Sequence, residues 1–356
     1  MNLDLTETQS LLQETVRAYL AREVPLDRIR QLEKEGAADA ALWKGVAQQG
    51  WLELPFACVD GGATLVDVGL LVEEFARRAA IAPIAEVAAA SWILAKHAPG
   101  AAEWNDGLAA GDRVPVPAVL EEAARGGALA AEVRGGRLAG RKTFVDYGQS
   151  ATHHLVAARG EGPGLYLVDA RGAGVACEPL RSIGRTPVCH VRYEGVPAER
   201  AAGAEAVTEL VQVARALAAV QCVGSMQQAL DLSVAYANVR EQFGVTIGTF
   251  QAVRHHCANM AIRVASARGL AYEALDALGR GAASDAMVAL AKASASRAAP
   301  EVTMLAHQIH GGNGVIEEND LYFHTLRAKE RSLAWGSFDE CMDVVATQVH
   351  READWL

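Results

Sequence analysis

The periodicity of the hydrophobic residues changes twice along this chain of 356 residues, and this restricts its fold more than any other feature. Apolar residues recur at helical spacing up to about Ala110. Short strand-like runs separated by glycine-rich turns follow from Gly111, and helical spacing returns at Ala204. The order of helices, strands and helices predicts an α+β fold. We expect an N-terminal helical domain at 1–112, a small antiparallel β-domain at 113–203 and a C-terminal helical domain at 204–356.

Local signals support individual elements of this plan. Thr6 and Gln9 have the spacing of a capping box, and Leu12, Val16 and Leu20 then share one helical face. Further helices are expected over 40–49, 65–80 and 85–95. Strands are expected over 114–119, 129–133, 165–168, 175–179 and 189–193. Because the first of these contains Pro115 and Pro117, it is restricted to an edge strand or an extended loop.

Composition excludes several classes of function. The net charge of −10 (33 basic minus 43 acidic residues) argues against a nucleic-acid partner. No uncharged run reaches the roughly 18 apolar residues that span a membrane, and the first residues do not resemble a secretory signal. The cysteines are scattered without zinc-ligand spacing, which favours reduced thiols in a cytoplasmic protein. We therefore expect no metal site and no membrane or nucleic-acid partner.

Two charged or histidine pairs on helices invite a catalytic interpretation. Glu73-Glu74 could serve acid–base chemistry. The simpler interpretation is a solvated helix face or ion pairing within the helix. In that interpretation Glu73, Glu74, Arg77 and Arg78 point mostly outward. His255-His256 has no matching metal-ligand partner and is interpreted as surface or packing histidines.

The segment 308–314, Gln-Ile-His-Gly-Gly-Asn-Gly, concentrates three glycines in four positions. It ends a helical segment that runs from Ala289 to His307, with a kink or restart expected at Pro300. Glycine adopts positive φ freely and leaves the backbone N–H uncovered, so such a turn can approach a ligand closely. A glycine-rich helix end is also an ordinary C-cap, and the turn alone does not decide between the two.

A second motif, Arg-Glu-Gln-Phe-Gly at 240–244, precedes Ile247 and Phe250-Gln251. Together with the glycine turn it resembles the acyl-CoA dehydrogenase family. The resemblance extends to 4–9, to Trp51–Leu54 with Asp60–Gly62, and to Leu138–Lys142, which resembles the strand before the flavin loop. The resemblance implies a four-helix bundle in the C-terminal domain. It also implies FAD as cofactor, an acyl-CoA thioester as substrate and electron-transfer flavoprotein or another electron acceptor.

In that family the FAD lies across a subunit interface, and one subunit clamps the pyrophosphate and adenosine of its neighbour's FAD. The resemblance places Arg240 at the pyrophosphate by charge-assisted hydrogen bonds. The other residues that it assigns to cofactor binding are Gln242, Phe243, Ile247, Phe250, Gln308, Gly311 and Gly312.

The residues that would run the chemistry have changed. A carboxylate must take the α-proton of the substrate while a hydride leaves the β-carbon. The position of the family's usual glutamate is Trp335, and the alternative position at the start of the helix leading to the second motif is Ala214. Neither residue can take a proton. Asp339 and Glu340 follow within about one helical turn and are weak candidates, provided that the chain is helical from Ser337.

The flavin loop has changed as well. The resemblance places Phe144-Val145-Asp146-Tyr147 where the family has Trp-Ile-Thr-Asn, with the threonine hydroxyl near the reactive ring nitrogen. A carboxylate at Asp146 would oppose the negative charge of a reduced flavin. The loop that covers flavin and substrate is not recognisable in 114–127, where Glu121-Glu122 is the nearest remnant. His310, inside the glycine turn, is a further weak candidate for a base.

These changes fall on one half of the site. The sequence therefore predicts a subunit of a heteromeric (α₂β₂) acyl-CoA dehydrogenase for a bulky acyl group such as a steroid side chain. This chain would clamp FAD, while a homologous subunit would supply the catalytic glutamate. Two alternatives stay open: a self-sufficient homo-oligomeric flavoenzyme with a non-standard base, and a non-catalytic member that binds an acyl-CoA or a protein.

Overall fold

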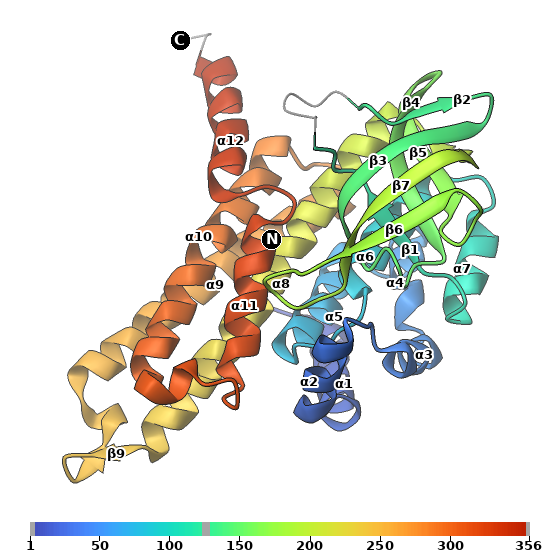
Figure 1. The fold of residues 1–356 in the computed structure, drawn as a ribbon. Coiled ribbons are helices and arrows are strands. Elements are labelled where there is room, and N and C mark those ends of the chain that lie inside the picture. Colours follow the sequence, from blue (N-terminus) through green and yellow to red (C-terminus); the bar gives the residue numbers. More distant parts are fainter. Residues whose placement is uncertain (1–3, 123–128, 354–356) are drawn as a thin grey trace. The chain divides into compact units, whose positions relative to one another are not determined.

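The computed structural model describes residues 4–122 and 129–353, which group into two compact units (Figure 1). One unit combines the chain up to Leu26 with Gly69–Ala80 and everything from Arg215 onward. The other combines Asp27–Val68 with Ile81–Ala214. The predicted α+β class, with helical terminal parts and a central sheet, is confirmed. The exact division at 112 and 203 stays a prediction.

The first unit is a helical bundle built on three long helices. They are α8 (Ala204–Val239), which belongs to this unit from Arg215 onward, α9 (Gln251–Gly279) and α10 (Asp285–His310). The shorter elements are α1 (Glu7–Glu23), β9 (Glu241–Gln242), β10 (Val245–Thr246), η2 (Ile247–Thr249), η3 (Gly311–Val315), α11 (Leu321–Leu333) and α12 (Phe338–Ala353). Many alanines of α9 and α10 are buried, such as Ala271 and Ala291. Such small side chains allow helix axes to approach closely.

Several sequence predictions in this unit are confirmed. Thr6 and Gln9 form the capping box of α1, with Gln9 N donating to Thr6 Oγ1 at 3.2 Å and Thr6 N to Gln9 Oε1 at 3.1 Å. In α8 the side chains of Val223, Met226 and Leu230 lie in the core, whereas Val234 is 41% exposed.

Of the kink or restart expected at Pro300, the restart is wrong. Helix α10 runs unbroken through Pro300 to His310. A proline removes one N–H donor from a helix, but most residues of α10 around it, including Ala298, Ala299 and Val302, are buried. Packing therefore holds the helix together across the missing bond.

The prediction that Glu73 and Glu74 face outward is also wrong. Their helix, α5 (Leu65–Arg77), buries both side chains to 1% and 2% exposure. Glu73 accepts hydrogen bonds from Arg268 and Tyr272 of α9, and Glu74 pairs with Arg17 of α1. Sequence spacing along one helix could not reveal these partners, because they lie 57 to 199 residues away.

The second unit carries the eight-stranded sheet. Its strands are β1 (Pro115–Ala118), β2 (Glu132–Arg134), β3 (Arg137–Asp146), β4 (His153–Gly160), β5 (Gly162–Asp169), β6 (Val175–Leu180), β7 (Val188–Pro197) and β8 (Glu199–Ala202). Its helices are α2 (Leu26–Glu35), which begins at the last residue of the other unit, α3 (Ala40–Gln48), η1 (Trp51–Glu53), α4 (Leu54–Asp60), α6 (Ile84–His97) and α7 (Ala101–Ala109). The five predicted strand runs all overlap observed strands.

The sheet is mostly but not wholly antiparallel. Its strand order is β6-β7-β3-β2-β4-β5-β8, with β1 attached to β4. Both β1 and β2 pair with β4 in parallel, which corrects the expectation of a purely antiparallel domain. Within the described ranges the proline-containing β1 pairs with that single strand, as its two missing N–H donors require. Strand β4 itself was not predicted from the sequence pattern.

Candidate functional site

The two motifs singled out in the sequence meet at one end of the helical bundle (Figure 1). The β9–β10 hairpin lies between α8 and α9, and the glycine turn follows α10. Tyr236, in the last turn of α8, stacks on His310, with ring centroids 4.5 Å apart and planes 19° from parallel. The backbone N–H of Arg240 donates to the carbonyl of Tyr236 at 2.9 Å. This stack therefore ties the start of the hairpin to the residue before Gly311.

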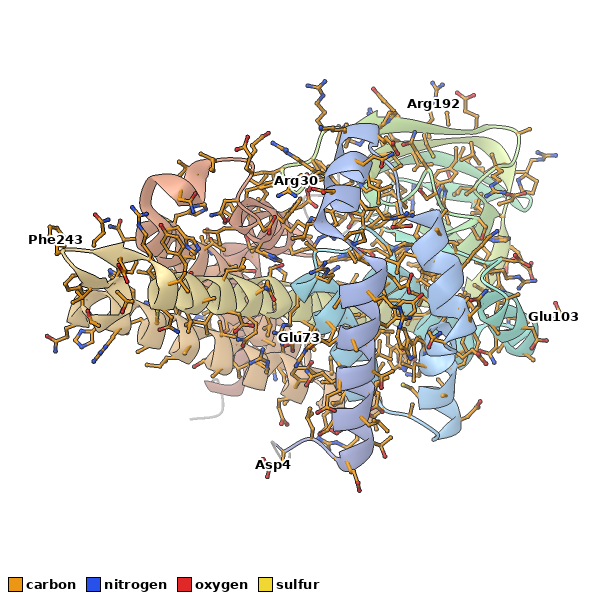
Figure 2. The ribbon with its side chains drawn as sticks, turned by 90° about the horizontal axis from the view of Figure 1, so that it is seen from below. Asp4, Arg30, Glu73, Glu103, Arg192 and Phe243 are labelled. Atoms are coloured by element: carbon orange, nitrogen blue, oxygen red, sulfur yellow. The ribbon has the colours of Figure 1, made fainter. Side chains whose placement is uncertain are left out.

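The hairpin presents a cation and an aromatic ring to solvent. Arg240 is exposed, and no residue of the described chain pairs with its guanidinium. Phe243 is 93% exposed and has φ +57°, followed by Gly244 at φ +80° (Figure 2). A bulky side chain at positive φ is a true backbone outlier. A strained, exposed aromatic residue of this kind is typical of a contact surface rather than of a packing role.

The remaining hairpin residues of the predicted cofactor set lie around Phe243. Gln242 is exposed and its amide donates to the carbonyl of Glu241 at 2.7 Å. Phe250 meets Phe243 edge to face, with centroids 6.2 Å apart. Ile247 donates its N–H to Arg240 O at 2.8 Å and is half-buried. These three residues thus shape the hairpin from which Arg240 and Phe243 project.

The glycine turn leaves its backbone open. Gly311 caps α10 with φ +58° and ψ −139°, a combination almost restricted to glycine. A Cβ at Gly311 or Gly312 would meet no heavy atom within 4 Å, whereas one at Gly314 would lie 2.9 Å from His310. Gln308 is exposed, and nothing in the described chain binds its amide. Gly311 and Gly312 are therefore accessible to a ligand, while Gly314 serves packing.

A matched pair of alanine variants should separate backbone strain from ligand contact at this turn. Gly311→Ala should lower the free energy of unfolding by about 1–3 kcal/mol, because alanine does not tolerate that conformation. Gly312→Ala should leave it within about 0.5 kcal/mol, because the site is open and its φ is not positive. Urea unfolding of both variants checks this, and equal losses would contradict it.

The histidines near the turn have structural roles. His310 is buried and its Nδ1 bonds to the carbonyl of Ala306 at 2.9 Å. His307 Nε2 bonds to Thr325 Oγ1 of α11 at 2.8 Å, and burial lowers its pKa. His310 therefore lacks the open face that a general base needs.

Neither predicted base position carries a carboxylate, and one of them is held in a strained turn. Ala214 is buried. Trp335 has φ +60° between α11 and α12. Arg215 Nε donates to its carbonyl at 2.9 Å, and the fully buried Lys292 Nζ donates to Ser332 O at 3.0 Å and Gly336 O at 2.8 Å. Two cations thus fix the turn that presents the indole.

The two weak candidates for a replacement base begin α12. The chain is helical from Phe338, as their candidacy requires. Glu340 accepts hydrogen bonds from Ser337 N at 2.8 Å and Ser337 Oγ at 2.9 Å, and these bonds lower its pKa. It is therefore occupied as a helix-capping residue and is a weakened base. Asp339 is exposed in the same turn.

The flavin-loop segment lies in the second unit, at a bulge of β3. The register against β7 shifts between Lys142 and Val145. Within it Phe144 is 62% exposed with φ +51°, and Tyr147 is buried with φ +54°. The loop before it is fastened by Glu121, which binds the buried Lys142 and accepts from Ala130 N and Ala131 N at 2.5 and 3.1 Å. Glu121 is therefore structural, while 123–128 lies outside the described residues.

Sequence reasoning missed Tyr236, Arg215 and Lys292. These residues lie outside both sequence motifs, yet they fix the hairpin, the glycine turn and the Trp335 turn. The sequence carries one signal for such a residue: Lys292 is an isolated lysine among alanines, which is typical of a buried, hydrogen-bonded cation. In the described ranges no group of three His, Cys, Asp or Glu side chains could hold a metal ion.

Among the described residues one helix, α8, is long enough and apolar enough to cross a membrane, judged by length and composition alone. Of its most apolar window, 61% is buried inside the structure, as in the core helix of a bundle. The six cysteines are free thiols.

Comparison with known proteins identifies the family of this chain. The descriptions "Acyl-CoA dehydrogenase, N-terminal domain" and "Acyl-CoA dehydrogenase, C-terminal domain" match residues 6–99 and 201–350. Acyl-CoA dehydrogenase FadE27 of Mycobacterium tuberculosis is 30% identical, covering 86% of this chain and 87% of its own. The steroid ACAD Tcur3481-Tcur3483 (G363A variant) superposes with a TM-score of 0.90 at 29% identity, covering 98% and 99%. The ChsE4-ChsE5 complex from Mycobacterium tuberculosis also gives 0.90, at 26% identity over 98% and 99%. With its N-terminal and C-terminal parts matched and a relative of 30% identity over most of its length, the chain belongs to the acyl-CoA dehydrogenase family.

Proposed function

We propose that this chain is the cofactor-clamping subunit of a heteromeric acyl-CoA dehydrogenase. The family uses FAD, which supplies the hydride acceptor for dehydrogenation of an acyl-CoA. The observation that carries the proposal is an asymmetry. Most of the residues that would clamp a neighbour's FAD are open to solvent, whereas a proton-accepting side chain is missing at both base positions.

The clamp residues fit the pyrophosphate half of FAD. The unpaired Arg240 offers a planar cation for bidentate phosphate binding. Gly311 and Gly312 leave room for phosphate oxygens beside the backbone, and Gln308 adds an amide. Phe243 would then gain the cover that its exposed ring lacks in this chain.

The flavin-ring half fits poorly. Asp146 stands where a hydroxyl would be needed, and its negative charge would oppose charge accumulating beside it. Trp335 fills the usual base position in a turn fixed by Arg215 and Lys292. We therefore infer that a homologous partner subunit supplies the catalytic glutamate and the ring-binding loop, and that activity requires both subunits. Two structural relatives that cover nearly the whole chain, Tcur3481-Tcur3483 and ChsE4-ChsE5, are likewise described as pairs.

The steroid description of one relative favours a bulky acyl group, such as a steroid side-chain thioester, as the substrate. An electron-transfer flavoprotein or another acceptor would reoxidise the complex, and a cytoplasmic location suits all these partners. The self-sufficient alternative would need Asp339, because Glu340 is engaged at the helix cap.

The role of Arg240 can be measured in the co-expressed complex. Arg240→Gln should weaken FAD retention by about 10- to 100-fold, since a charge-assisted bidentate contact is worth about 1.5–3 kcal/mol. Arg240→Lys should lose less, because the charge remains while the fork geometry is lost. Fluorescence titration of the deflavinated complex with FAD gives the affinities. The matched control is Arg280→Gln, which replaces an exposed arginine at the end of α9. Unchanged FAD affinity in Arg240→Gln would show that Arg240 does not hold the FAD of the complex, and the clamping role assigned to it would be wrong.

A further inference from the structure

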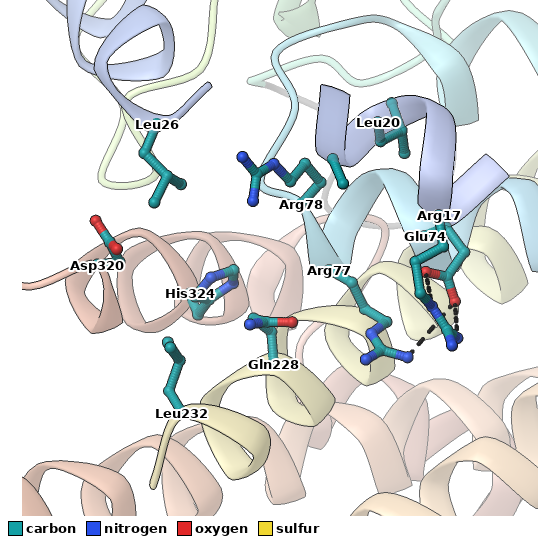
Figure 3. Close-up of a pocket in the computed structure, with 11 residues that line it drawn as sticks. Arg17, Leu20, Leu26, Glu74, Arg77, Arg78, Gln228, Leu232, Asp320 and His324 are labelled. Atoms are coloured by element: carbon teal, nitrogen blue, oxygen red, sulfur yellow. Dashed lines mark hydrogen bonds and ion pairs between the residues drawn. The ribbon is translucent and has the colours of Figure 1, made fainter. Parts of the chain in front are cut away.

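A cavity of about 250 Å³ lies within the first unit, away from the hairpin and the glycine turn (Figure 3). It is lined by residues of α1, α5, α8 and α11, by the first residue of α2, and by Arg78 and Asp320 at the ends of α5 and α11. Its charged groups are three arginines (Arg17, Arg77, Arg78) and two carboxylates (Glu74, Asp320), a formal balance of 3 − 2 = +1. Leucines 20, 26 and 232 form its apolar walls.

Two of the arginines are compensated. Arg17 holds Glu74 through two hydrogen bonds, of 3.0 Å from Nε and 2.8 Å from the terminal nitrogen. Arg77 lies 3.6 Å from the same carboxylate and pairs with Asp231 at 2.7 Å. The Glu74 carboxylate is therefore occupied, as the dashed lines of Figure 3 show.

Arg78 is not compensated in this way. Its Nε donates to the carbonyl of Val24 at 2.8 Å, and within the described ranges no carboxylate lies at ion-pair distance from it. Burial lowers the pKa of Arg78, and Asp320 opposes that shift from farther away. A partly buried cation whose counter-charge lies beyond ion-pair distance is costly, because the hydrogen bond to Val24 O only partly replaces the water that it has lost.

Two neutral groups of the same cavity also lack partners. The Nδ1 atom of His324 is buried without a hydrogen bond in the described structure. Gln228, from α8, makes no hydrogen bond with any described residue. Figure 3 shows the imidazole of His324 among Arg78, Gln228 and Asp320. Buried polar groups are satisfied in nearly all native proteins, so the buried Nδ1 of His324 points to a ligand with oxygen atoms, and the half-buried Gln228 beside it adds a second polar group.

The charges around His324 indicate the sign of that ligand. Burial, followed by the nearby Arg327, Arg78 and Arg77, lowers the pKa of His324 to about 3. The imidazole is therefore neutral in a region of positive potential, where a negative group would be favoured.

We propose that this cavity binds a small organic carboxylate. The Arg78 guanidinium would hold the carboxylate by charge-assisted hydrogen bonds, and Gln228 and His324 would bond its remaining polar atoms. The leucine walls would cover a short alkyl segment, which inorganic phosphate cannot use. This site does not depend on the proposed cofactor role of the chain.

Calorimetric titration of the full chain in a chloride buffer tests the proposal, with butyrate as the probe and inorganic phosphate as a second arm. Butyrate should bind saturably at one site per chain, and Arg78→Gln should weaken it at least about tenfold, with Arg78→Lys in between. Arg280→Gln and Arg240→Gln should leave the affinity unchanged.

Several results would overturn the proposal. No saturable binding of butyrate, or equal affinity in Arg78→Gln, would show that the cavity is not a carboxylate site. Loss of binding in Arg240→Gln would assign the anion to the hairpin instead. Phosphate binding without butyrate binding would refute the organic class. Because Arg78→Gln also removes the bond to Val24, the parent offers a second readout: saturation should shift the imidazole ¹⁵N resonances of His324.

Discussion

Replacing Arg268 by methionine should lower the free energy of unfolding by about 3–5 kcal/mol, the usual cost of leaving a buried charge unpaired. Glu73 is 1% exposed and accepts from Arg268 at 2.7 and 3.3 Å and from Tyr272 Oη at 2.8 Å. Without Arg268 the carboxylate would keep only the tyrosine hydroxyl. Denaturant unfolding of the single variant measures the loss, with the slope of the transition checked against the parent.

The matched control is Arg280→Met, which removes an arginine from an ion pair with Asp276 in which the arginine is 59% exposed. It should cost less than about 1 kcal/mol. The double variant Arg268→Met with Glu73→Met should recover much of the stability, because it buries no unpaired charge. A loss below about 1 kcal/mol in Arg268→Met alone would contradict the assigned role of this pair.

Acid should destabilise the first unit through His324. In the folded chain the pKa of His324 is about 3, against an ordinary value of 6.5, because burial and three arginines oppose its protonation. The unfolded chain therefore binds a proton below pH 6.5 that the folded chain refuses. Stability from the neutral imidazole is complete above pH 6.5 and is lost as the pH falls toward 3. Between pH 6.5 and 5 this single group should cost about 2 kcal/mol.

The variant His324→Gln should flatten that acid slope by about one proton, because glutamine does not titrate. The exposed His255→Gln serves as the control and should keep the parent's slope. Chemical denaturation at pH 5.0, 5.5, 6.0 and 6.5 supplies the comparison. An unchanged slope in His324→Gln would mean that another group dominates the acid response.

The parts that could be predicted from the sequence are those fixed by local chemistry. The capping box of α1 needs only Thr6 and Gln9, and the glycine turn needs only backbone freedom at Gly311. The strand runs follow from short apolar segments between glycine turns. The cofactor residues were placed by resemblance, and their assignment to FAD stays a proposal for this chain.

The features that could not be predicted from the sequence depend on contacts between residues far apart in the chain. Glu73 and Glu74 have the spacing of a solvated face, but arginines from other helices allow them to be buried. Pro300 breaks a helix in isolation, whereas packing on both sides carries α10 through it. Trp335 has a positive φ in a turn that accepts hydrogen bonds from distant residues. Arg215 lies 120 residues from its acceptor, and Lys292 lies 40 and 44 residues from its two acceptors.

The ratio of FAD to chain tests the central claim most directly. The chain would be purified alone and, separately, after co-expression with a homologous subunit that carries the catalytic glutamate; absorbance gives the flavin and light scattering the mass. We predict little or no FAD on the chain alone and one FAD per pair of unlike subunits in the complex. One FAD per chain in the protein purified alone would show that each copy builds a complete site, and the clamping-subunit account would be wrong.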